Sequence, residues 1–341
     1  MKAMAVDGYG PLERLRQVEV PEGRAGTGEV LVHVVASALN PADYKVIGGS
    51  MTFLHAHTSP LVMGYDFSGT VKAVGAKVTR LAVGQDVFGC LAYGPFNRRG
   101  AFAESVVVRE GEVGVKPPSV SHRAAAAAAT AGLTALQGIR TLGRLPHGGR
   151  LLVTGVSGGV GSLAVGIGVR LGGEVTAIGS GAGLELARAL GASMVWDRTR
   201  AEVTRAVTGT FDVVFDAAAS YRWRQWRHAL TRGGAFVTTL PTAAFFVDKV
   251  LSLPTRTRAH MVAVKSTTAA LDEVGRWLAD GLAAPIDSVI AVRDVAAGLE
   301  RLRAGRAKGR IVVDVEGGFS GAENDTRGNS WPVGPAIGGS N

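Results

Sequence analysis

The sequence predicts an α/β protein in which an all-β unit precedes a doubly wound parallel sheet. Three observations carry this prediction. The first third of the chain holds short apolar runs punctuated by Gly, Pro and Asn, whereas strand-like and helical stretches alternate after about residue 121. In addition, a glycine cluster in "LLVTGVSGGVG" (151–161) stands where an apolar run gives way to helical spacing.

The strands expected in the first third are short and close together. They are "EVLVHVVASAL" (29–39), "SGTVKAVG" (68–75), "DVFGCLA" (86–92) and "FAESVVV" (102–108). No strand–helix alternation separates these runs, which favours a compact all-β domain over residues 1–120.

From Ser121 the pattern changes. The stretch "SHRAAAAAATAGLTALQGIRTLG" is expected to be helical, because alanine is the strongest helix former and the stretch contains no proline. Helices then alternate with the strand-like runs "RLLVTG", "EVTAIGS", "MVWD", "FDVVFDAAA", "GAFVTTL" and "HMVAV". This alternation is typical of βαβ units around a parallel sheet, which we expect to span residues 121–264.

The remaining residues divide into two parts. Residues 265–316 contain two amphipathic helices and the strand "GRIVVDV" (309–315). Residues 317–341 are rich in Gly, Ser, Asn and Pro and have no apolar periodicity, which predicts a disordered tail.

Composition argues against several classes of protein. Hydrophobic residues at 46% and charged residues at 19% are the balance of a globular chain. A single cysteine, Cys90, excludes an intrachain disulfide framework and a cysteine-rich structural zinc site. The start "MKAMAVDGYGP" lacks the layout of a signal peptide, and no uncharged apolar run is long enough to cross a membrane. We expect a soluble cytoplasmic protein.

The net charge of +9 raises the question of nucleic-acid binding. The basic residues are scattered among acids, as in residues 293–310, and aromatic residues make up only 6% of the chain. A nucleic-acid binder more often concentrates basic residues in a stripe interleaved with aromatics. We therefore expect a solvated basic surface, which also favours an anionic cofactor, and no nucleic-acid partner.

The glycine cluster predicts a phosphate site. Glycine lets a ligand approach the backbone closely, and the start of a helix presents unpaired N–H groups that favour an anion. A tight turn without a ligand is the alternative, but the place of the cluster after the first strand of a doubly wound unit favours a dinucleotide. The residues expected to hold its pyrophosphate are Ser157, Gly158, Gly159, Val160 and Gly161.

Over residues 1–316 the chain resembles the zinc-free, quinone-oxidoreductase-like branch of the medium-chain dehydrogenase/reductase superfamily. The markers occur in the family's order: "GEVLVHVVASALNPADYK", "LVMGYDFSGTVKAVGAKVTRLAVGQDVFG", "GAFAESVVV", "AAAATAGLTALQGI", "GVSGGVG", "LGA" and "GRAKGRIVVDV". The resemblance implies a GroES-like β domain, with which the C-terminal segment packs again, and a Rossmann domain inserted between.

The same superfamily includes zinc-dependent alcohol dehydrogenases, whose ligands are replaced here. Asn40 stands where they have a cysteine, and Tyr65 stands where they have a histidine. Their structural zinc needs four cysteines. His55 and His57 form a His-x-His pair without an evident third ligand, so we expect no metal.

The resemblance implies reduction of an activated alkene (an enone or enal) or of a quinone by a nicotinamide cofactor. It places Asn40 beside the nicotinamide, and Tyr44 is the candidate hydrogen-bond donor or proton source. Packing of the domain is the alternative role of Tyr44, and Asp43 is expected to cap or order the turn. Some relatives have tyrosines where this chain has Lys45 and Met51, which leaves the proton donor open.

The cofactor expected is NADPH. The second strand of the parallel sheet ends without a carboxylate for a ribose 2′-OH and offers the hydroxyl of Ser180 instead. Arg198, where the family often has a tyrosine, is predicted to contact the 2′-phosphate. Gly183 stands where NADP-binding members often have a lysine. Three residues are candidates for the nicotinamide end, each with an ordinary core or turn role as the alternative: Thr134, Ala217 and Leu240.

Three functions follow as hypotheses. The leading one is an NADPH-dependent reductase of a small conjugated carbonyl or a quinone. The second is a tailoring enzyme of secondary metabolism that performs polyketide-like enoyl reduction or a non-redox cyclisation. The third is a nucleotide-binding interaction or RNA-binding protein without catalysis. No membrane partner is expected, and a homodimer is left open.

Overall fold

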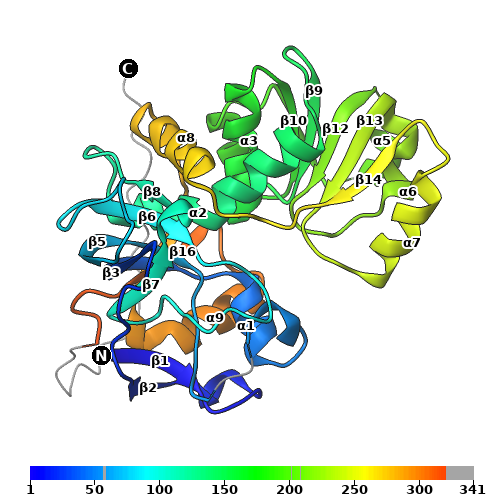
Figure 1. Cartoon of the computed structure of the whole chain (residues 1–341). Helices are drawn as coiled ribbons and strands as arrows, with labels where there is room; N and C mark the ends of the chain where they lie inside the picture. Colours follow the sequence, from blue (N-terminus) through cyan, green and yellow to red (C-terminus); the bar gives the residue numbers. More distant parts are fainter. Residues whose placement is uncertain (57–58, 201, 208, 320–341) are drawn as a thin grey trace. The chain divides into compact units, whose positions relative to one another are not determined.

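The computed structural model describes residues 1–56, 59–200, 202–207 and 209–319 (Figure 1). The chain separates into two units, and the predicted α/β class is confirmed. The first unit comprises Met1–Thr130, Lys265–Gly281 and the chain from Ile286 onward, and the second comprises Ala131–Val264 and Leu282–Pro285. The tail expected from residue 317 lies outside the described residues from residue 320 on.

The first unit is built on antiparallel strands. Its seven-stranded sheet has the order β15-β16-β3-β5-β6-β8, with β7 paired to β3, and a three-stranded sheet has the order β2-β1-β4. The strands are β1 (Lys2–Val6), β2 (Arg16–Glu19), β3 (Glu29–Ala38), β4 (Leu61–Val62), β5 (Asp66–Val74), β6 (Asp86–Cys90), β7 (Ser105–Arg109), β8 (Val113–Val115), β15 (Ile286–Ala291) and β16 (Arg310–Asp314).

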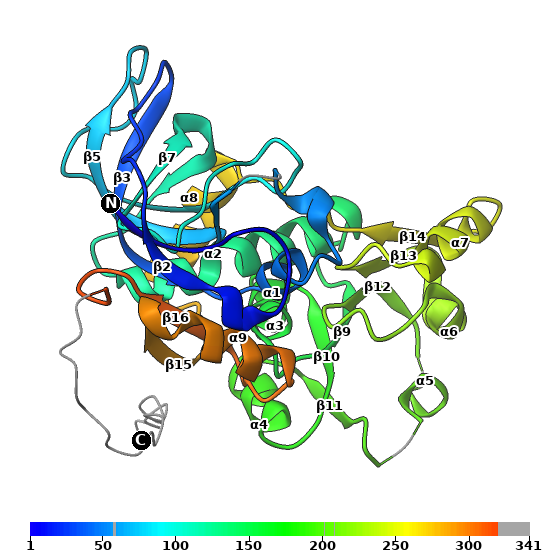
Figure 2. The ribbon, with the colours of Figure 1, turned by 90° about the horizontal axis from the view of Figure 1, so that it is seen from below.

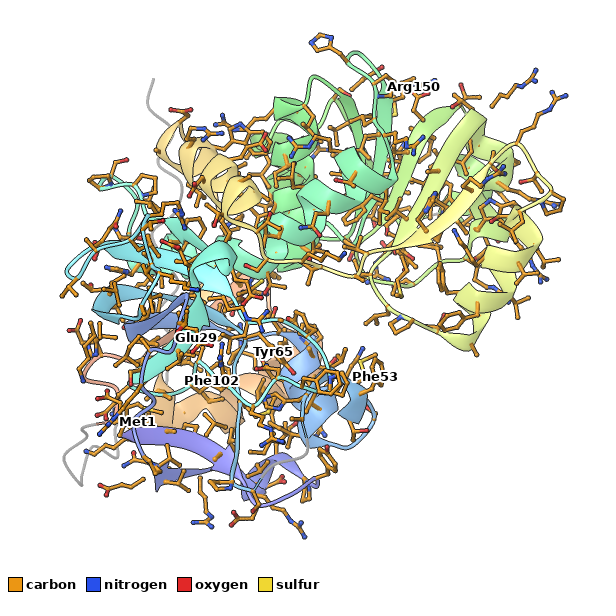
Figure 3. All side chains as sticks on the ribbon, viewed as in Figure 1. Met1, Glu29, Phe53, Tyr65, Phe102 and Arg150 are labelled. Carbon is orange, nitrogen blue, oxygen red and sulfur yellow. The ribbon has the colours of Figure 1, made fainter. Side chains whose placement is uncertain are left out.

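Strand β3 is the centre of this unit, because it pairs with β5, β7 and β16. Apolar side chains along it, such as Val30, Val32 and Val34, are fully buried. Tyr65 and Phe102 are also buried in this core, whereas Phe53 is 53% exposed (Figure 3). Long-range pairing of one strand with three others therefore holds the first unit together.

Helices also belong to the first unit. Those within residues 1–120 depart from the expected all-β domain, whereas the two longest, within residues 265–316, are the two amphipathic helices that the sequence predicts. They are α1 (Pro41–Ile47), α8 (Thr268–Ala279), α9 (Val295–Arg303) and the short helices η1 (Leu12–Arg14), η2 (Thr52–Leu54), η3 (Glu110–Glu112) and η6 (Val292–Asp294). Helix α1 begins at Pro41, whose fixed φ suits the first helical position. The carboxylate of Asp43 accepts a hydrogen bond from the Asn40 N–H (2.7 Å), which confirms its expected capping role.

The second unit is a six-stranded parallel sheet of order β11-β10-β9-β12-β13-β14 (Figure 2). Its strands are β9 (Arg150–Thr154), β10 (Glu174–Gly179), β11 (Met194–Asp197), β12 (Phe211–Asp216), β13 (Leu230–Thr238) and β14 (Arg258–Met261). From β9 the chain adds β10 and β11 toward one edge of the sheet. It then returns to β12, beside β9, and adds β13 and β14 toward the other edge, so the strand order switches between β9 and β12. In doubly wound sheets ligands bind at such a switch point.

The helices of this region are α2 (His122–Leu136), η4 (Gln137–Leu142), α3 (Gly159–Arg170), α4 (Ala182–Ala189), α5 (Val203–Ala206), α6 (Trp223–Trp226), η5 (Arg227–Ala229) and α7 (Ala243–Ser252). The division between the units falls within α2, after Thr130, whereas the sequence analysis places a domain boundary at 120. One reason is that the Thr130 N–H donates to the Asp66 carboxylate of the first unit (2.7 Å). Among the described helices, none combines the length and the apolar character needed to span a bilayer.

Candidate functional site

The glycine-rich turn joins β9 to α3 in the second unit. Gly155, directly after the strand, has φ +72°, a conformation that glycine adopts without strain. Gly158 is the N-cap residue of α3, and the helical hydrogen bonds begin where the Ser162 N–H donates to the Gly158 carbonyl (2.9 Å). The amides of residues 159–161 therefore come before the first helical donor, in the position where helix starts bind anions.

Gly158 and Gly161 have different structural roles in this turn. A Cβ atom on Gly161 would lie 2.2 Å from the Gly155 carbonyl oxygen, so the helix packs directly against the turn. A Cβ atom on Gly158 would have its nearest neighbour at 3.5 Å, again the Gly155 oxygen. Gly161 is thus required by packing, whereas Gly158 leaves open space beside the helix start. A side chain at position 158 would fill this space, so the turn keeps room for a group such as the predicted pyrophosphate.

A buried hydrogen bond fixes the strand ends beneath the turn. The Thr154 hydroxyl, at the end of β9, donates to Asp216 Oδ1 at the end of β12 (2.6 Å). The Tyr221 N–H donates to the other carboxylate oxygen (2.8 Å). Burial raises the pKa of Asp216, against the effect of these hydrogen bonds. The sequence analysis did not identify Thr154 and Asp216, which lock the two strands that flank the switch point.

The other residues predicted to bind the cofactor follow neighbouring strands. Ser180 follows β10, Arg198 follows β11, Ala217 follows β12 and Leu240 lies just beyond β13. Because the strands are parallel, the sheet brings these residues to the same edge as the glycine turn. The remaining candidate, Thr134, is 7% exposed in α2.

Arg198 and Ser180 lie close in the fold through their strands. The Arg198 N–H donates to the Gly179 carbonyl (2.9 Å), next to Ser180, and the Arg198 side chain is exposed. Gly183, where NADP-binding members of the resembling family often have a lysine, is buried, and a Cβ atom there would lie 2.2 Å from Ser157 Oγ. A lysine at 183 would therefore require Ser157 to move.

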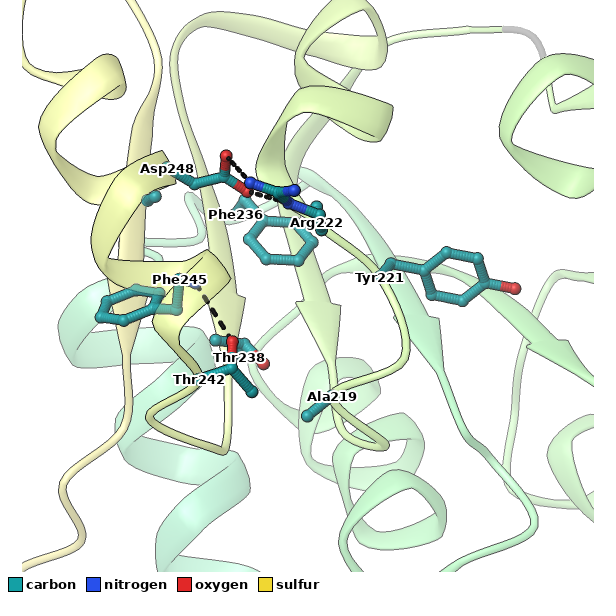
Figure 4. A pocket seen from close by; sticks show the side chains of 9 residues that line it. Ala219, Tyr221, Arg222, Phe236, Thr238, Thr242, Phe245 and Asp248 are labelled. Atoms are coloured by element: carbon teal, nitrogen blue, oxygen red, sulfur yellow. Dashed lines mark hydrogen bonds and ion pairs between the residues drawn. The ribbon is translucent and has the colours of Figure 1, made fainter.

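A small pocket lies farther along the same unit, between β13 and α7 (Figure 4). Its volume is about 20 Å³, room for about one water molecule. Asp248, 2% exposed in its side chain, forms ion pairs with Arg222 and Arg224 (both 3.0 Å). This pocket is part of the packing of α7 and is too small for a substrate.

In the first unit Asn40 belongs to a buried polar network. Its Nδ2 donates to Asp66 Oδ2 (2.9 Å), and its Oδ1 accepts from Arg310 Nη1 (3.0 Å). Arg310 also forms an ion pair with Asp66, and the three residues are no more than 4% exposed. The sequence analysis missed Asp66 and Arg310 as partners, since they lie 244 residues apart. We call Asn40, Asp66 and Arg310 the polar triad.

Burial dominates the electrostatics around the polar triad. It raises the pKa of Asp66, although Arg310 acts in the opposite direction. It also raises the pKa of the neighbouring Asp43 to about 8. The Asn40 amide uses both its donor and its acceptor inside the protein. Asn40 therefore joins the chain just after β3 to β5 and β16.

The residues at the positions of the family's catalytic zinc ligands do not fit a metal. The Asn40 amide is engaged in the polar triad, and the Tyr65 hydroxyl donates to the Leu54 carbonyl (3.2 Å). Both ring nitrogens of His55 lie 3.1 Å from carbonyl oxygens, of Ala56 and Arg99, and His57 lies outside the described residues. Within the described ranges no three His, Cys, Asp or Glu side chains are grouped so as to hold a metal ion.

Tyr44 lies on α1 and is half-buried against the core of the first unit. Burial raises the pKa of its hydroxyl, and burial lowers the pKa of the adjacent Lys45. Met51 packs against the same core. Tyr44 thus combines a packing role with a hydroxyl that stays protonated at neutral pH.

Comparison with known proteins agrees with both units. The family "Alcohol dehydrogenase GroES-like domain" matches residues 26–118, and the family "Zinc-binding dehydrogenase" matches residues 190–313. The chain is 30% identical to the trans-enoyl reductase pgmF of Aspergillus terreus, over 87% of this chain and 90% of that protein. It is 36% identical to the NADPH-dependent alkenal/one oxidoreductase of Arabidopsis thaliana, over 64% of this chain and 57% of that protein.

A solved structure extends the agreement to the fold. The quinone oxidoreductase from Coxiella burnetii superposes with a TM-score of 0.82 at 26% identity, covering 92% of this chain and 99% of that one. The predicted GroES-like and Rossmann domains are confirmed by these matches.

Proposed function

This chain belongs to the quinone-oxidoreductase-like branch of the medium-chain dehydrogenase/reductase superfamily, and we propose that it reduces activated alkenes or quinones with NADPH and without zinc. The open space at Gly158, beside the free amides of α3, is the observation that carries this proposal. When bound, the nicotinamide supplies the hydride.

The residues proposed to hold the cofactor line the carboxyl edge of the parallel sheet. The backbone of residues 158–161 and the Ser157 hydroxyl face the pyrophosphate in this proposal, with Ala217, Leu240 and Thr134 toward the nicotinamide. Asp216, held by Thr154, fixes the strand ends that support the turn. The protein would thus contribute orientation to a reaction whose reactivity comes from the cofactor.

NADPH is proposed over NADH because of the charges at the adenosine end. Gly179 and Ser180 close β10 without a carboxylate, and the exposed guanidinium of Arg198 comes from the adjacent strand end. The nearby Asp197 carboxylate accepts two hydrogen bonds from Thr199 (2.9 and 2.7 Å), so it is engaged locally. A free guanidinium can bind a phosphate in a bidentate, charge-assisted contact.

Reduction without a Lewis acid is proposed because Asn40 and Tyr65 stand at the positions of the metal ligands, and the Asn40 amide is engaged with Asp66 and Arg310. A carbonyl conjugated to the reacting double bond is already activated, so the protein needs only to donate a hydrogen bond to the developing oxyanion. Tyr44 is the proposed donor or proton source, because its hydroxyl remains protonated. Asn40 is proposed to shape the wall of the site through Asp66 and Arg310.

A second candidate function is enoyl reduction in secondary metabolism. The match to a trans-enoyl reductase over 87% of this chain favours it. The chemistry is the same conjugate reduction, and the two functions differ in the group that carries the unsaturated acyl chain.

The test is a substrate panel in which oxidation of NADPH and of NADH is followed separately. The panel contains an enone, an enal, a quinone and an enoyl thioester, and Gly158→Val is the matched control. We expect turnover with NADPH that the control lacks. Elemental analysis of the active protein checks the metal. Stoichiometric zinc, with activity lost on chelation, would refute the zinc-free mechanism.

A further inference from the structure

A cavity of about 460 Å³ lies in the first unit, and no residue of the polar triad lines it. It is formed by the loop after β6, the end of β7 and η3. Its lining includes Tyr93, Phe96, Asn97, Arg98, Arg99 and Arg109. Its volume is within the range of small-molecule sites.

The cavity carries a surplus of positive charge. Three guanidinium groups line it, and Glu112 is the carboxylate that faces them. Arg99 forms an ion pair with Glu29, and β-sheet register places Arg109 opposite the same glutamate. Arg98 is exposed and takes part in no ion pair seen among the described residues. Arg98 is therefore the first group available to an anion, and Arg109, which stands opposite Glu29 but forms no ion pair among the described residues, is the second.

Asn97 supplies a second, independent donor. Its Oδ1 accepts a hydrogen bond from the Arg99 N–H (3.0 Å), which fixes the orientation of the amide. Its Nδ2 is buried and meets no acceptor in the part of the chain that the structure describes. A buried donor without an acceptor is uncommon, and an oxygen atom of a bound molecule would satisfy it.

The other wall of the cavity is aromatic. Phe96 is 93% exposed, although a side chain of this size is usually covered. The Tyr93 ring stacks on Tyr65 with 4.2 Å between ring centroids. Tyr65 directly precedes Asp66 in the sequence, so a single stacked pair of rings connects the cavity wall to the polar triad. A flat, conjugated group would pack well on this wall.

We propose that this cavity binds the anionic end of the substrate, a carboxylate or phosphate attached to the conjugated carbonyl compound. Arg98, Arg109 and the Asn97 amide hold the anion, and Phe96 and Tyr93 pack against the unsaturated part. This proposal rests on the proposed reductase function and names the class of substrate that the function would select. Neutral enones are then poorer substrates than acidic ones.

The experiment compares matched substrates that differ only in charge. They are an enone with a terminal carboxylate, its methyl ester, and the same enone with a phosphate monoester. In Arg98→Ala and in Arg109→Ala we expect KM for the two anionic substrates to rise about tenfold, the loss of one charge-assisted contact, while kcat and the KM of the ester stay unchanged. Arg24→Ala is the control, an exposed arginine of the same unit that does not line the cavity.

A binding measurement separates this proposal from the proposed function. Calorimetry follows binding of the saturated keto acid, which cannot be reduced, to wild type and Arg98→Ala. Binding that depends on Arg98 supports the anion site in the cavity, whether or not any alkene is turned over. Absence of turnover with every substrate would refute the reductase function and leave the anion site standing. Turnover of the ester and the anions with equal KM, or equal losses for all three substrates in Arg98→Ala, would overturn the anion site and leave the reductase standing. Thermal melting of each variant checks that the fold is intact.

Discussion

The glycine turn of the second unit and the polar triad of the first are built on opposite principles. The turn offers backbone amides and leaves space at Gly158, where a Cβ atom would approach nothing closer than 3.5 Å. The polar triad is made of side chains that satisfy one another and are no more than 4% exposed. Changes in the turn should therefore alter binding, and changes in the triad should alter stability.

The largest effect is expected for Arg310→Ala. It leaves the Asp66 carboxylate buried without its cation, which should lower the free energy of unfolding by about 3–5 kcal/mol. The matched control is Arg123→Ala, which removes an exposed ion pair with Asp314 and should cost no more than about 1 kcal/mol. Chemical denaturation measures both. Equal losses would mean that the triad is no more than a surface contact.

Gly158→Val should abolish NADPH binding, a loss of at least about a hundredfold in affinity, because the side chain fills the space proposed for the pyrophosphate. Its melting temperature should stay near that of wild type, since the position is open. Gly161→Ala is the contrasting variant. Its Cβ atom would lie 2.2 Å from the Gly155 oxygen, so its melting temperature should fall. Unchanged NADPH affinity in Gly158→Val would place the cofactor elsewhere.

The sequence predicts the glycine turn better than the triad, for physical reasons. Gly155 to Gly161 lie together in the chain, between a strand and a helix whose periods differ, so local pattern is enough to place the turn. Asp66 and Arg310 come from β5 and β16, and their pairing depends on how distant strands meet. The local sequence pattern does not show which distant strands lie together in the sheet.

Two elements of the first unit were also outside the reach of local pattern. Helix α1 spans only Pro41–Ile47, too short for a clear apolar period. Strand β15 (Ile286–Ala291) lies between two amphipathic helices and is identified by its parallel pairing with β16. Phe319 is 8% exposed in the core of the first unit, although its polar, glycine-rich surroundings predict a tail.

Arg198→Ala tests which end of the cofactor the second unit distinguishes. If the guanidinium contacts the 2′-phosphate, NADPH should bind roughly tenfold to a hundredfold more weakly, which corresponds to about 1.5–3 kcal/mol. NADH lacks that phosphate and should bind almost as before. Dissociation constants of both cofactors for both proteins decide the matter. Equal losses, or none, would remove Arg198 from the cofactor site.

Asn40→Ala should give the smallest change of the four variants. It tests the stability expected from the polar triad and the cofactor binding expected from the glycine turn in the same protein. Loss of the amide leaves Asp66 and Arg310 each one hydrogen bond short, which should lower the free energy of unfolding by roughly 1–3 kcal/mol. Turnover should fall more than NADPH affinity, because the polar triad and the glycine turn belong to different units. Steady-state kinetics and cofactor titration provide the two numbers. A variant that lost cofactor affinity first would contradict the separation.

The pairing of β16 with β3 also sets an order of events during synthesis. The second unit is almost continuous in the chain, from Ala131 to Val264, so all six strands of its sheet are available once that segment has left the ribosome. The first unit begins earlier but finishes later, because β3 waits for β16 and Asp66 waits for Arg310. Until then the Ala36–Ala38 end of β3 lacks its partner strand and Asp66 lacks the Arg310 guanidinium. The nascent chain therefore carries an early strand, β3, incompletely paired until almost the end of its synthesis.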